Sequence, residues 1–383
     1  MKMRCGAVLS VMTVTSQFLL PAMAEEAHPT MKLDGRIAID AGLSHDGNET
    51  INGSEIRLLW LGAKGKVSDD VSYRVLLGFE GNKTSIKDAI ITYTGIDNVK
   101  LMAGNFKAFT GIENMSSNLH LTFIERSNGI KPFRPIRRMG FGATYASKHM
   151  SVAGGIFGGD LNNINGVDQP WSVSGRVVGA PILSEDGRNV LHLGVSTYRE
   201  MTPADDHVVK YSGAGETHVI NEKLVSTGSI NGAETAATNA VEALFIAGPF
   251  SVMSEYSQTT VGRDSMPDLD YSGGYANVSY FLTGEQRSYK VADGTVGRVK
   301  PNHPVDEGGR GAFEVAARYT TLDLLDDGIS AGGEMDSVTV GVNWYPDSRI
   351  KLMANHVINS TSGGTTVPDY EPQYSMLRMQ VDF

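Results

Sequence analysis

The sequence predicts an all-β protein: a transmembrane antiparallel β-barrel of about sixteen strands. Three observations lead to this fold class. Segments in which apolar and polar residues alternate recur along the chain, as strands with two different faces require. No apolar segment after residue 24 approaches the roughly 20 residues that a membrane-spanning helix needs. The last alternating segment, Tyr374–Phe383, ends on an aromatic residue, as the closing strand of a bacterial outer-membrane barrel usually does.

The amino-terminus has the pattern of a secretory signal peptide. A positively charged start is followed by an apolar stretch that ends in the small residues Ala22-Met23-Ala24, just before two glutamates. We therefore expect residues 1–24 to be a cleaved leader and residues 25–383 to form a single barrel domain. The one cysteine, Cys5, lies in the leader, so the mature chain should have no disulfide and no sulfur-bound metal.

The charge of the chain is clearly negative. Asp and Glu number 43 against 33 Lys and Arg, which is a formal net charge of -10 at pH 7. A nucleic-acid partner is therefore not expected, because such partners require basic surfaces. The mean hydropathy of -0.16 resembles that of a soluble protein. A barrel explains this value, since only every second residue of its strands faces lipid.

Sixteen segments have the alternation of half-buried strands. In the clearest, Val71–Glu80, every second residue from Val71 to Phe79 is apolar or aromatic. An even number of antiparallel strands suits a closed barrel, because closure leaves no unpaired edge in the bilayer. The others, before Tyr374–Phe383, are Leu33–Leu43, Ile56–Ala63, Asp88–Thr94, Val99–Phe106, Phe141–Ala146, Ser151–Phe157, Trp171–Ala180, Val190–Glu200, Asn239–Ala247, Phe250–Gln258, Gly273–Leu282, Gly311–Tyr319, Ser337–Tyr345 and Ile350–Val357.

The expected connections alternate in length, as in barrels with short periplasmic turns and long external loops. Tight periplasmic turns are expected at Asp97-Asn98, Ser147-Lys148, Gly248-Pro249 and Pro346-Asp347-Ser348. Long external loops rich in Gly, Asp, Asn and Pro are expected at Ser44–Glu55, Lys107–Gly140, Met201–Thr238, Thr283–Arg310, Thr320–Asp336 and Asn359–Gln373.

Two other interpretations remain open. A soluble β-sandwich shows the same alternation, although the leader and the terminal Phe383 favour the barrel. An enzyme is not expected, because the chain has no His-Glu-x-x-His motif and no phosphate-binding glycine loop. No cofactor or metal is expected either. A barrel hydrolase whose triad assembles only in space is the remaining catalytic alternative.

Several segments resemble the family of phosphate-selective porins O and P. The resemblance covers nearly the whole mature chain, and its most specific parts are an LTGE-x-Arg-x-Tyr stretch and a G-V-N-W-Y stretch. It implies a sixteen-stranded homotrimeric porin in the outer membrane of a Gram-negative bacterium. It also implies that the third external loop, here Lys107 to about Arg138, folds into the lumen and forms a constriction. Matching segments include Lys32–Gly42, Asp88–Ile96, Leu101–Ser127, Leu191–Glu200 and Gly273–Lys290.

The resemblance also implies an anion site at the constriction. Arg36 matches a family arginine by its L-x-G-R setting, and Asp88 matches the acidic residue before an A-x-I-x-Y-T-G run. Ser116 and Ser117 match the loop serines that follow Glu113. These residues are therefore candidates for binding or orienting an anion in the pore.

This chain departs from the family pattern at two places. Where the family has paired arginines, Ile56 precedes a single Arg57, and Asn114 stands in place of the loop lysine. Together with Lys107 and Arg126, in or beside the loop, Arg57 and Asn114 complete the candidate pore residues. Because two positive charges are missing, we expect poorer phosphate binding than in the family.

The densest basic cluster of the mature chain is Lys131–Arg138. Two places are open for it: the lumen, or a solvated external loop in contact with lipopolysaccharide. Other arginines are expected to pair with carboxylates along their own strands and line a water-filled barrel. The expected pairs are Arg74 with Glu80, Arg318 with Glu314, and Arg378 with Asp382.

The sequence thus predicts a porin for passive diffusion of small anions, of the phosphate type by family resemblance. The alternative is a general diffusion porin for small hydrophilic solutes with little phosphate selectivity. Both functions need the same fold and differ in the fixed charge of the lumen. The expected partners are these solutes, outer-membrane lipid and lipopolysaccharide, and further copies of the chain.

Overall fold

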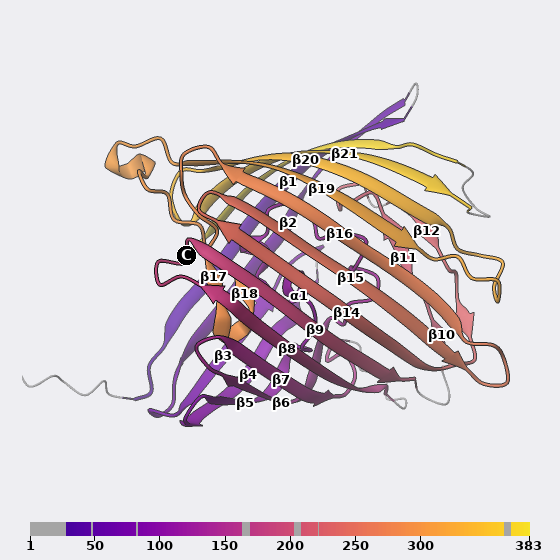
Figure 1. Ribbon diagram of the computed structural model, residues 1–383, viewed down its shortest axis with the longest axis horizontal. Coiled ribbons are helices and arrows are strands. Elements are labelled where there is room, and N and C mark those ends of the chain that lie inside the picture. Colours follow the sequence, from indigo (N-terminus) through magenta and orange to yellow (C-terminus); the bar gives the residue numbers. More distant parts are fainter. Residues whose placement is uncertain are drawn as a thin grey trace, which may run out of the picture.

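The computed structural model describes residues 28–383, except 47–48, 82, 163–168, 203–207, 221 and 364–368. Within this range, sixteen antiparallel strands form one closed barrel (Figure 1). The predicted signal peptide, residues 1–24, lies outside the described residues. None of the helices in the described range is long and apolar enough to span a membrane.

All sixteen predicted strands are confirmed, most of them with longer ends than the alternation showed. Each barrel strand pairs with its neighbours in chain order. The first eight are β1 (Lys32–Asp46), β2 (Glu49–Lys66), β3 (Val71–Gly78), β4 (Ser85–Ile96), β5 (Val99–Lys107), β6 (Arg137–Ala146), β7 (Met150–Phe157) and β8 (Trp171–Leu183). The second eight are β9 (Asn189–Met201), β14 (Ala233–Ala247), β15 (Phe250–Arg263), β16 (Leu269–Phe281), β19 (Ala312–Asp323), β20 (Glu334–Tyr345), β21 (Ile350–Ser362) and β22 (Gln373–Asp382).

The barrel closes where β22 pairs with β1. Beyond the end of β22, Phe383 and Gly35 exchange two backbone hydrogen bonds of 3.0 and 3.1 Å. On β22, Leu377 and Met379 are 61% and 50% exposed, whereas the intervening Arg378 is 4% exposed. The alternation seen in the sequence therefore separates an outer apolar face from an inner polar face, as a membrane barrel requires.

All four predicted tight turns lie at one end of the barrel, and one of them, Pro346-Asp347-Ser348, lies between β20 and β21. Asp97-Asn98 joins β4 to β5, Ser147-Lys148 opens the β6–β7 turn, and Gly248-Pro249 joins β14 to β15. Asn98 and Gly248 have φ angles of 63° and 56°. Gly and Asn tolerate this left-handed conformation, which hairpin turns of two residues require.

Two of the predicted external loops are wrong. At Ser44–Glu55 the strands continue, because β1 extends to Asp46 and β2 begins at Glu49. The segment 282–311 is long, but it joins β16 to β19 at the end of the barrel that carries Gly248-Pro249, since neighbouring strands are antiparallel. Its length is typical of an external loop. The up-and-down order of the strands, however, places it at the end of the barrel where the tight turns lie.

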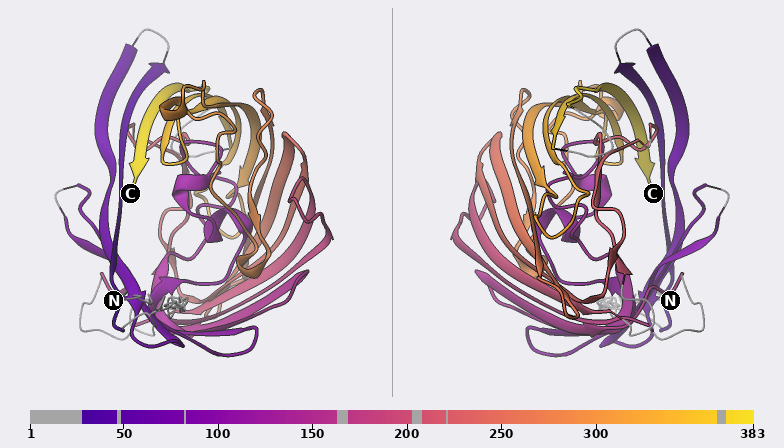
Figure 2. Two further views of the ribbon diagram at one scale, coloured as in Figure 1. Left: turned by 90° about the vertical axis from the view of Figure 1, so that its left-hand side faces the viewer. Right: turned by 90° about the vertical axis from the view of Figure 1, so that its right-hand side faces the viewer.

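Three long connections bear on the lumen: the constriction loop (residues 108–136), the mouth loop (residues 202–232) and the base loop (residues 282–311). In Figure 2 the constriction loop lies inside the ring of strands. Its shorter elements are α1 (Ile112–Met115) and η1 (Asn118–His120). Those of the mouth loop are β10 (Val208–Val209), β11 (Ser212–Ala214), β12 (Lys223–Ser226) and β13 (Ile230–Asn231), and those of the base loop are β17 (Tyr289–Lys290), η2 (Val291–Asp293), β18 (Thr295–Val296) and η3 (Val305–Glu307).

The constriction loop crosses the barrel to the strands on the far side. Asn343 on β20 donates to the backbone oxygen of Thr122 at 2.8 Å, and Lys351 on β21 donates to that of Leu121 at 2.6 Å. Gln380 on β22 donates to the oxygen of Leu119 at 3.0 Å. The prediction of a long loop folded into the barrel is confirmed.

The mouth loop fills part of the remaining interior with apolar side chains. Tyr211, Leu224 and Ile230 belong to the largest buried cluster, together with wall residues such as Leu322 and Tyr374. This cluster covers the inner face of many strands in the second half of the barrel and excludes water from it. The open space therefore lies against the first half, β1 to β8.

Candidate functional site

The candidate site is an internal cavity of about 1580 Å³. Its walls are β1 to β8, β22, the constriction loop and the base loop. The β3–β4, β7–β8 and β20–β21 connections contribute two or three residues each, and the mouth loop contributes His218. Among the described residues, β9, β14, β15, β16, β19, β20 and β21 contribute no lining residue. The open path therefore runs along one side of the barrel.

Positive charge dominates this cavity. Its described lining residues include seventeen Lys and Arg but eight Asp and Glu, although the whole chain carries a net charge of -10. Fixed charge close to a permeating ion acts with little screening, whereas charges more than about 8 Å away are largely screened at physiological ionic strength. The local excess of cations is therefore the charge that a solute in the lumen experiences.

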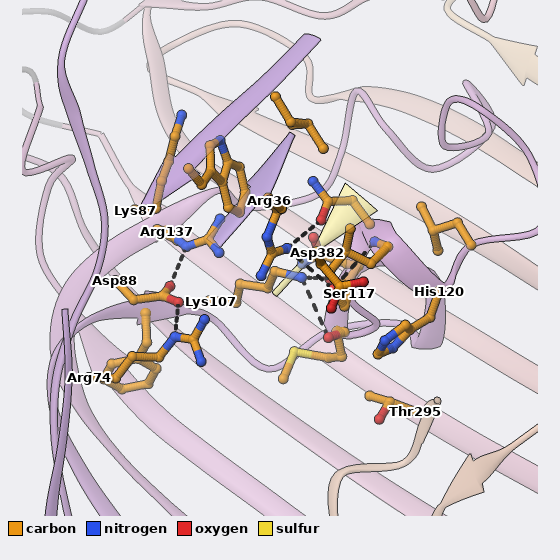
Figure 3. A pocket seen from close by; sticks show the side chains of 18 of the residues that line it. Arg36, Arg74, Lys87, Asp88, Lys107, Ser117, His120, Arg137, Thr295 and Asp382 are labelled. Atoms are coloured by element: carbon orange, nitrogen blue, oxygen red, sulfur yellow. Dashed lines mark hydrogen bonds and ion pairs between the residues drawn. The ribbon is translucent and has the colours of Figure 1, made fainter. Parts of the chain in front are cut away.

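The centre of the site is a group of cations around the indole of Trp60. The guanidinium carbon of Arg36 lies 4.7 Å from the ring centroid, and that of Arg137 lies 5.3 Å from it. The Nζ of Lys87 also lies 5.3 Å from the centroid. Arg36, Lys87 and Arg137 come from β1, β4 and β6 (Figure 3), and together with Trp60 of β2 they line the cavity.

Asp88 on β4 orients part of this group, as Figure 3 shows. One carboxylate oxygen accepts from Nε of Arg137 at 2.6 Å, and the other accepts from Nε of Arg74 at 3.0 Å. Arg74 also donates to Asp34 at 2.8 Å. The acidic residue predicted for the site thus lies between two arginines that it holds in place.

Arg36 connects the wall to the constriction loop. Its Nη1 donates to Oδ1 of Asn118 at 2.7 Å and lies 3.4 Å from Oγ of Ser117. Its Nε is buried and has no hydrogen-bond partner among the described residues. Arg36, Asp88 and Ser117 all line the cavity, as their predicted roles require.

Lys107 and Arg126 line the cavity, as predicted, but their donors also hold the constriction loop together. The Nζ of Lys107 donates to the backbone oxygens of Asn114 and Ser116 at 2.5 and 2.9 Å. Arg126 donates to those of Glu113 and Ser116, each at 3.0 Å. The two cations thus satisfy carbonyl groups at the end of α1, which would otherwise lack partners.

Glu113 and Ser116 do not line the cavity, contrary to the prediction for a constriction site. Glu113 accepts from the backbone N–H of Ser127 at 3.0 Å, and Ser116 accepts from that of Val296 in the base loop at 3.2 Å. Asn114 is 1% exposed and donates to Thr110 at 2.8 Å. Asn114 nevertheless lines the cavity, as predicted. The hydrogen bonds of these three residues shape the constriction loop and join it to the base loop, which sequence spacing alone could not reveal.

Arg57 lines the cavity, but a carboxylate neutralises it. It forms two hydrogen bonds with Glu125 of the constriction loop, at 2.8 and 3.2 Å. Burial raises the pKa of Glu125, but Arg57, Lys131 and Arg378 together hold it well below its usual range. The Arg57–Glu125 pair is therefore ionised at neutral pH and adds little net charge to the pore.

The basic segment Lys131–Arg138 lies inside the barrel. Arg134 and Arg137 line the cavity, and Arg138 lies 3.5 Å from Glu200 on β9. Burial, and then the positive charge of Arg126, lower the pKa of Arg134. Of the two places left open by the sequence, the lumen is therefore the correct one.

The expected ion pairs along single strands are wrong, because the arginines reach other elements. Arg74 binds Asp34 and Asp88 in place of Glu80. Arg318 binds Glu113 and Glu216 in place of Glu314, and Arg378 binds Asp40 and Glu125 in place of Asp382. Inward side chains converge across the lumen, so the nearest carboxylate is often on a loop or on another strand.

Sequence reasoning missed Trp60 and Lys87. In β2, apolar residues occupy both faces around Trp60, so alternation does not show which way the ring points. In β4, Lys87 is an extra residue at a β-bulge, because Leu76 pairs with Asp88 and Leu77 pairs with Ile86. A bulge re-aims side chains, and the period of two could not show that Lys87 and Asp88 face the same space.

Comparisons with known proteins agree with this fold. Residues 31–383 match the family described as phosphate-selective porin O and P. The chain is 27% identical over 368 residues to Porin O of Pseudomonas aeruginosa, covering 86% of this chain and 82% of that protein. It is 29% identical over 374 residues to a protein of Caulobacter vibrioides, covering 92% of this chain and 74% of that protein. Among solved structures, the trimer form of OmpT, an outer-membrane protein of Vibrio cholerae, matches with a TM-score of 0.57 at 12% identity, covering 92% of this chain and 99% of that one.

Proposed function

The chain belongs to the family of phosphate-selective porins O and P, and we propose that its outer-membrane channel prefers small anions. The observation that carries this proposal is that seventeen Lys and Arg but eight Asp and Glu line the cavity. Anions entering the lumen pass the cations around Trp60, whose positive charge attracts them and repels small cations. Passive diffusion through this path needs no catalytic group.

Arg36 is the side chain best suited to contact the permeating anion. It lines the cavity and is partly exposed, its Nη1 bonds to the uncharged Asn118 and Ser117, and no hydrogen bond within the described chain uses its Nη2. Arg74 and Arg137, by contrast, are each bound to Asp88. A guanidinium group with unused donors is a preferred partner for carboxylate or phosphate oxygens.

Phosphate selectivity is proposed to be weak. Asn114 stands where the family has a loop lysine, and its buried side chain lies beside Arg134 at 3.2 Å. Arg57 stands alone where the family has two arginines, and its charge is neutralised by the ion pair with Glu125. Two charges that would bind a phosphate are thus replaced or neutralised. A lysine at position 114 would be buried next to Arg134, so this substitution alone is not expected to restore phosphate binding.

The test is the current through the purified channel in planar bilayers. Arg36→Gln should lower the ratio of anion to cation permeability, while Arg188→Gln, in an exposed turn of the chain, should leave it unchanged. Adding phosphate to chloride solutions should block the wild-type current only weakly. A wild-type channel that prefers cations, or equal effects of the two substitutions, would refute the proposed function.

For the assembly we propose a homotrimer of single-domain chains, residues 25–383, exported with residues 1–24 as the leader. The trimer form of the similar OmpT supports this state. Outward residues of β22 such as Leu377 and Met379 would face lipid or a neighbouring copy. Cross-linking and native mass of the detergent-extracted protein test the trimer, and the amino-terminal sequence of that protein tests the leader.

A further inference from the structure

We propose that Trp60 is a positioning residue for anion selectivity: its indole ring holds Arg36, Lys87 and Arg137 together at the pore without cancelling their charge. This inference rests on the proposed anion preference and adds to it the residue that maintains the charge. Trp60 does not itself bind the anion in this proposal.

The three cations around Trp60 repel one another, and only Arg137 and Lys87 have a carboxylate partner in the described chain. A carboxylate would hold them, but it would also neutralise one of them. An aromatic ring attracts cations through the negative charge of its faces while its own net charge stays zero. With ring distances of 4.7, 5.3 and 5.3 Å, all three lie within the roughly 6 Å in which this attraction acts.

The nearby carboxylates cannot do this work alone. Asp88 already accepts from Arg74 and Arg137, and Glu80 lies 3.2 Å from Lys87. Arg36 has no carboxylate partner within the described chain and bonds instead to Asn118 and Ser117. Without the ring, repulsion would drive Arg36 away from Arg137 and into other positions in the cavity.

The ring itself is held firmly. Trp60 is 8% exposed and packs in a small buried cluster with Ala38, Leu58 and Leu76 on the inner face of β1 to β3. Its Nε1 donates a hydrogen bond to Glu80. Packing and this bond together fix the orientation of the ring, and Arg36 lies directly opposite Trp60 in the pairing of β1 with β2.

The inference makes Trp60 distinct from an ordinary core residue. Trp60→Leu keeps every charge of the pore, yet it should lower the anion-to-cation permeability ratio by about threefold, as expected for the loss of weak contacts to three cations. Trp60→Phe keeps an aromatic face but loses the bond to Glu80, so it should retain most of the selectivity. Heat-modifiable migration on gels shows whether each variant has folded.

A second experiment changes the ring without changing its shape and so does not depend on folding of the leucine variant. The chain has three tryptophans, Trp60, Trp171 and Trp344. In a Trp171→Phe, Trp344→Phe background, fluorinated tryptophan can be placed at position 60 alone. Fluorine withdraws electrons from the ring, so anion selectivity should fall stepwise from no fluorine to one and then two.

The outcomes separate this inference from the proposed function. A wild-type channel that prefers cations refutes the proposed function. Anion selectivity that is unchanged by Trp60→Leu, or by fluorination, overturns the inference alone. Equal losses in Trp60→Phe and Trp60→Leu would assign the effect to the hydrogen bond with Glu80 and would also overturn it.

Discussion

The two halves of this barrel use the same residue types for different purposes. Strands β1 to β8 face the open cavity, whereas β9, β14 to β16 and β19 to β21 face inserted loops and buried apolar side chains. We call β1 to β8 the open half and the other strands just named the packed half. In the packed half, the buried arginines pair with carboxylates: Arg318 binds Glu216, and Arg287 binds Glu314. Against the open half, cations outnumber carboxylates.

This difference explains how a chain with a net charge of -10 can form a positively charged lumen. Several carboxylates of the inserted loops and of the packed wall, such as Glu216 and Glu314, form buried ion pairs and do not line the cavity. The charge that governs permeation comes from the few side chains that share the open space. Net charge is therefore a poor guide to the selectivity of a pore.

The largest expected effect comes from removing the cation that ties two loops to the packed wall. Arg318 binds Glu216 of the mouth loop and Glu113 of the constriction loop, and it donates to the backbone oxygen of Glu125 at 3.1 Å. Arg318→Met removes the ion-pair partner of both buried glutamates, which should cost about 3–5 kcal/mol of stability. Thermal unfolding in detergent, followed by circular dichroism, measures the loss.

Arg263→Met is the matched control, because Arg263 donates to Pro267 in a short exposed turn. Similar melting temperatures for the two variants would contradict the difference between the halves. Open-state current should also become noisier in Arg318→Met, since the constriction loop loses an anchor.

A second pair of substitutions tests two glutamates that lie directly opposite each other on β14 and β15. Glu242 binds Arg176 at 2.5 Å and His192 at 3.0 Å, so Glu242→Gln should destabilise the protein by about 1.5–3 kcal/mol.

Glu255 accepts from the N–H of Glu113 and from Tyr275, and a glutamine oxygen can accept both bonds. Because Glu255→Gln also removes repulsion between like charges, it should melt at or above the wild-type temperature. A greater loss in Glu255→Gln would show that its charge is needed.

The contact between the constriction loop and the packed wall depends on glycines. Gly129 packs against the backbone of Gly273 and Gly274 on β16, and a methyl group on Gly129 would overlap the carbonyl oxygen of Gly274. Gly129→Ala should cost about 1–3 kcal/mol and push the loop toward the open half. Single-channel conductance should therefore fall. Gly179→Ala, where a methyl group meets nothing within 4 Å, should leave conductance unchanged; a fall in both variants would refute this role of Gly129.

The smallest expected effect concerns pH in the open half. Burial, and then the positive charges of Arg298 and Lys290, lower the pKa of His120 to about 4. His120 is thus uncharged at neutral pH and gains a positive charge only as the pH falls through that value. Anion preference should rise more in the wild type than in His120→Asn between pH 5 and 3. Identical curves for the two proteins, measured as zero-current potentials, would contradict this assignment.

Much of the fold could be predicted because a barrel strand repeats every two residues. All sixteen strands were found, since alternation separates lipid from lumen. The sequence did not show at which end of the barrel residues 282–311 lie. Their length is typical of an external loop, whereas counting the strands places them at the other end. The positions of Arg36, Asp88 and Ser117 at the cavity agree with the motif matches. Their partners could not be predicted, because contacts across a lumen join residues up to hundreds of positions apart.

Local irregularities hid the rest of the site. The bulge at Lys87 interrupts the period of two, and the apolar run in β2 hides the direction of Trp60. The roles assigned to Glu113, Asn114 and Ser116 assumed that loop residues face the pore. Asn114 does line the cavity, whereas Glu113 and Ser116 bond to the backbone of Ser127 and of Val296. Nothing in the spacing of the sequence distinguishes the two situations.

The most direct test of the central claim is the zero-current potential of the wild-type channel in a potassium chloride gradient at neutral pH. If the cations of the open half govern permeation, the sign of this potential must show that chloride crosses faster than potassium. A potential of the opposite sign would mean that the negative charge of the whole chain prevails over the lining of the cavity. It would contradict the proposed role of the open half.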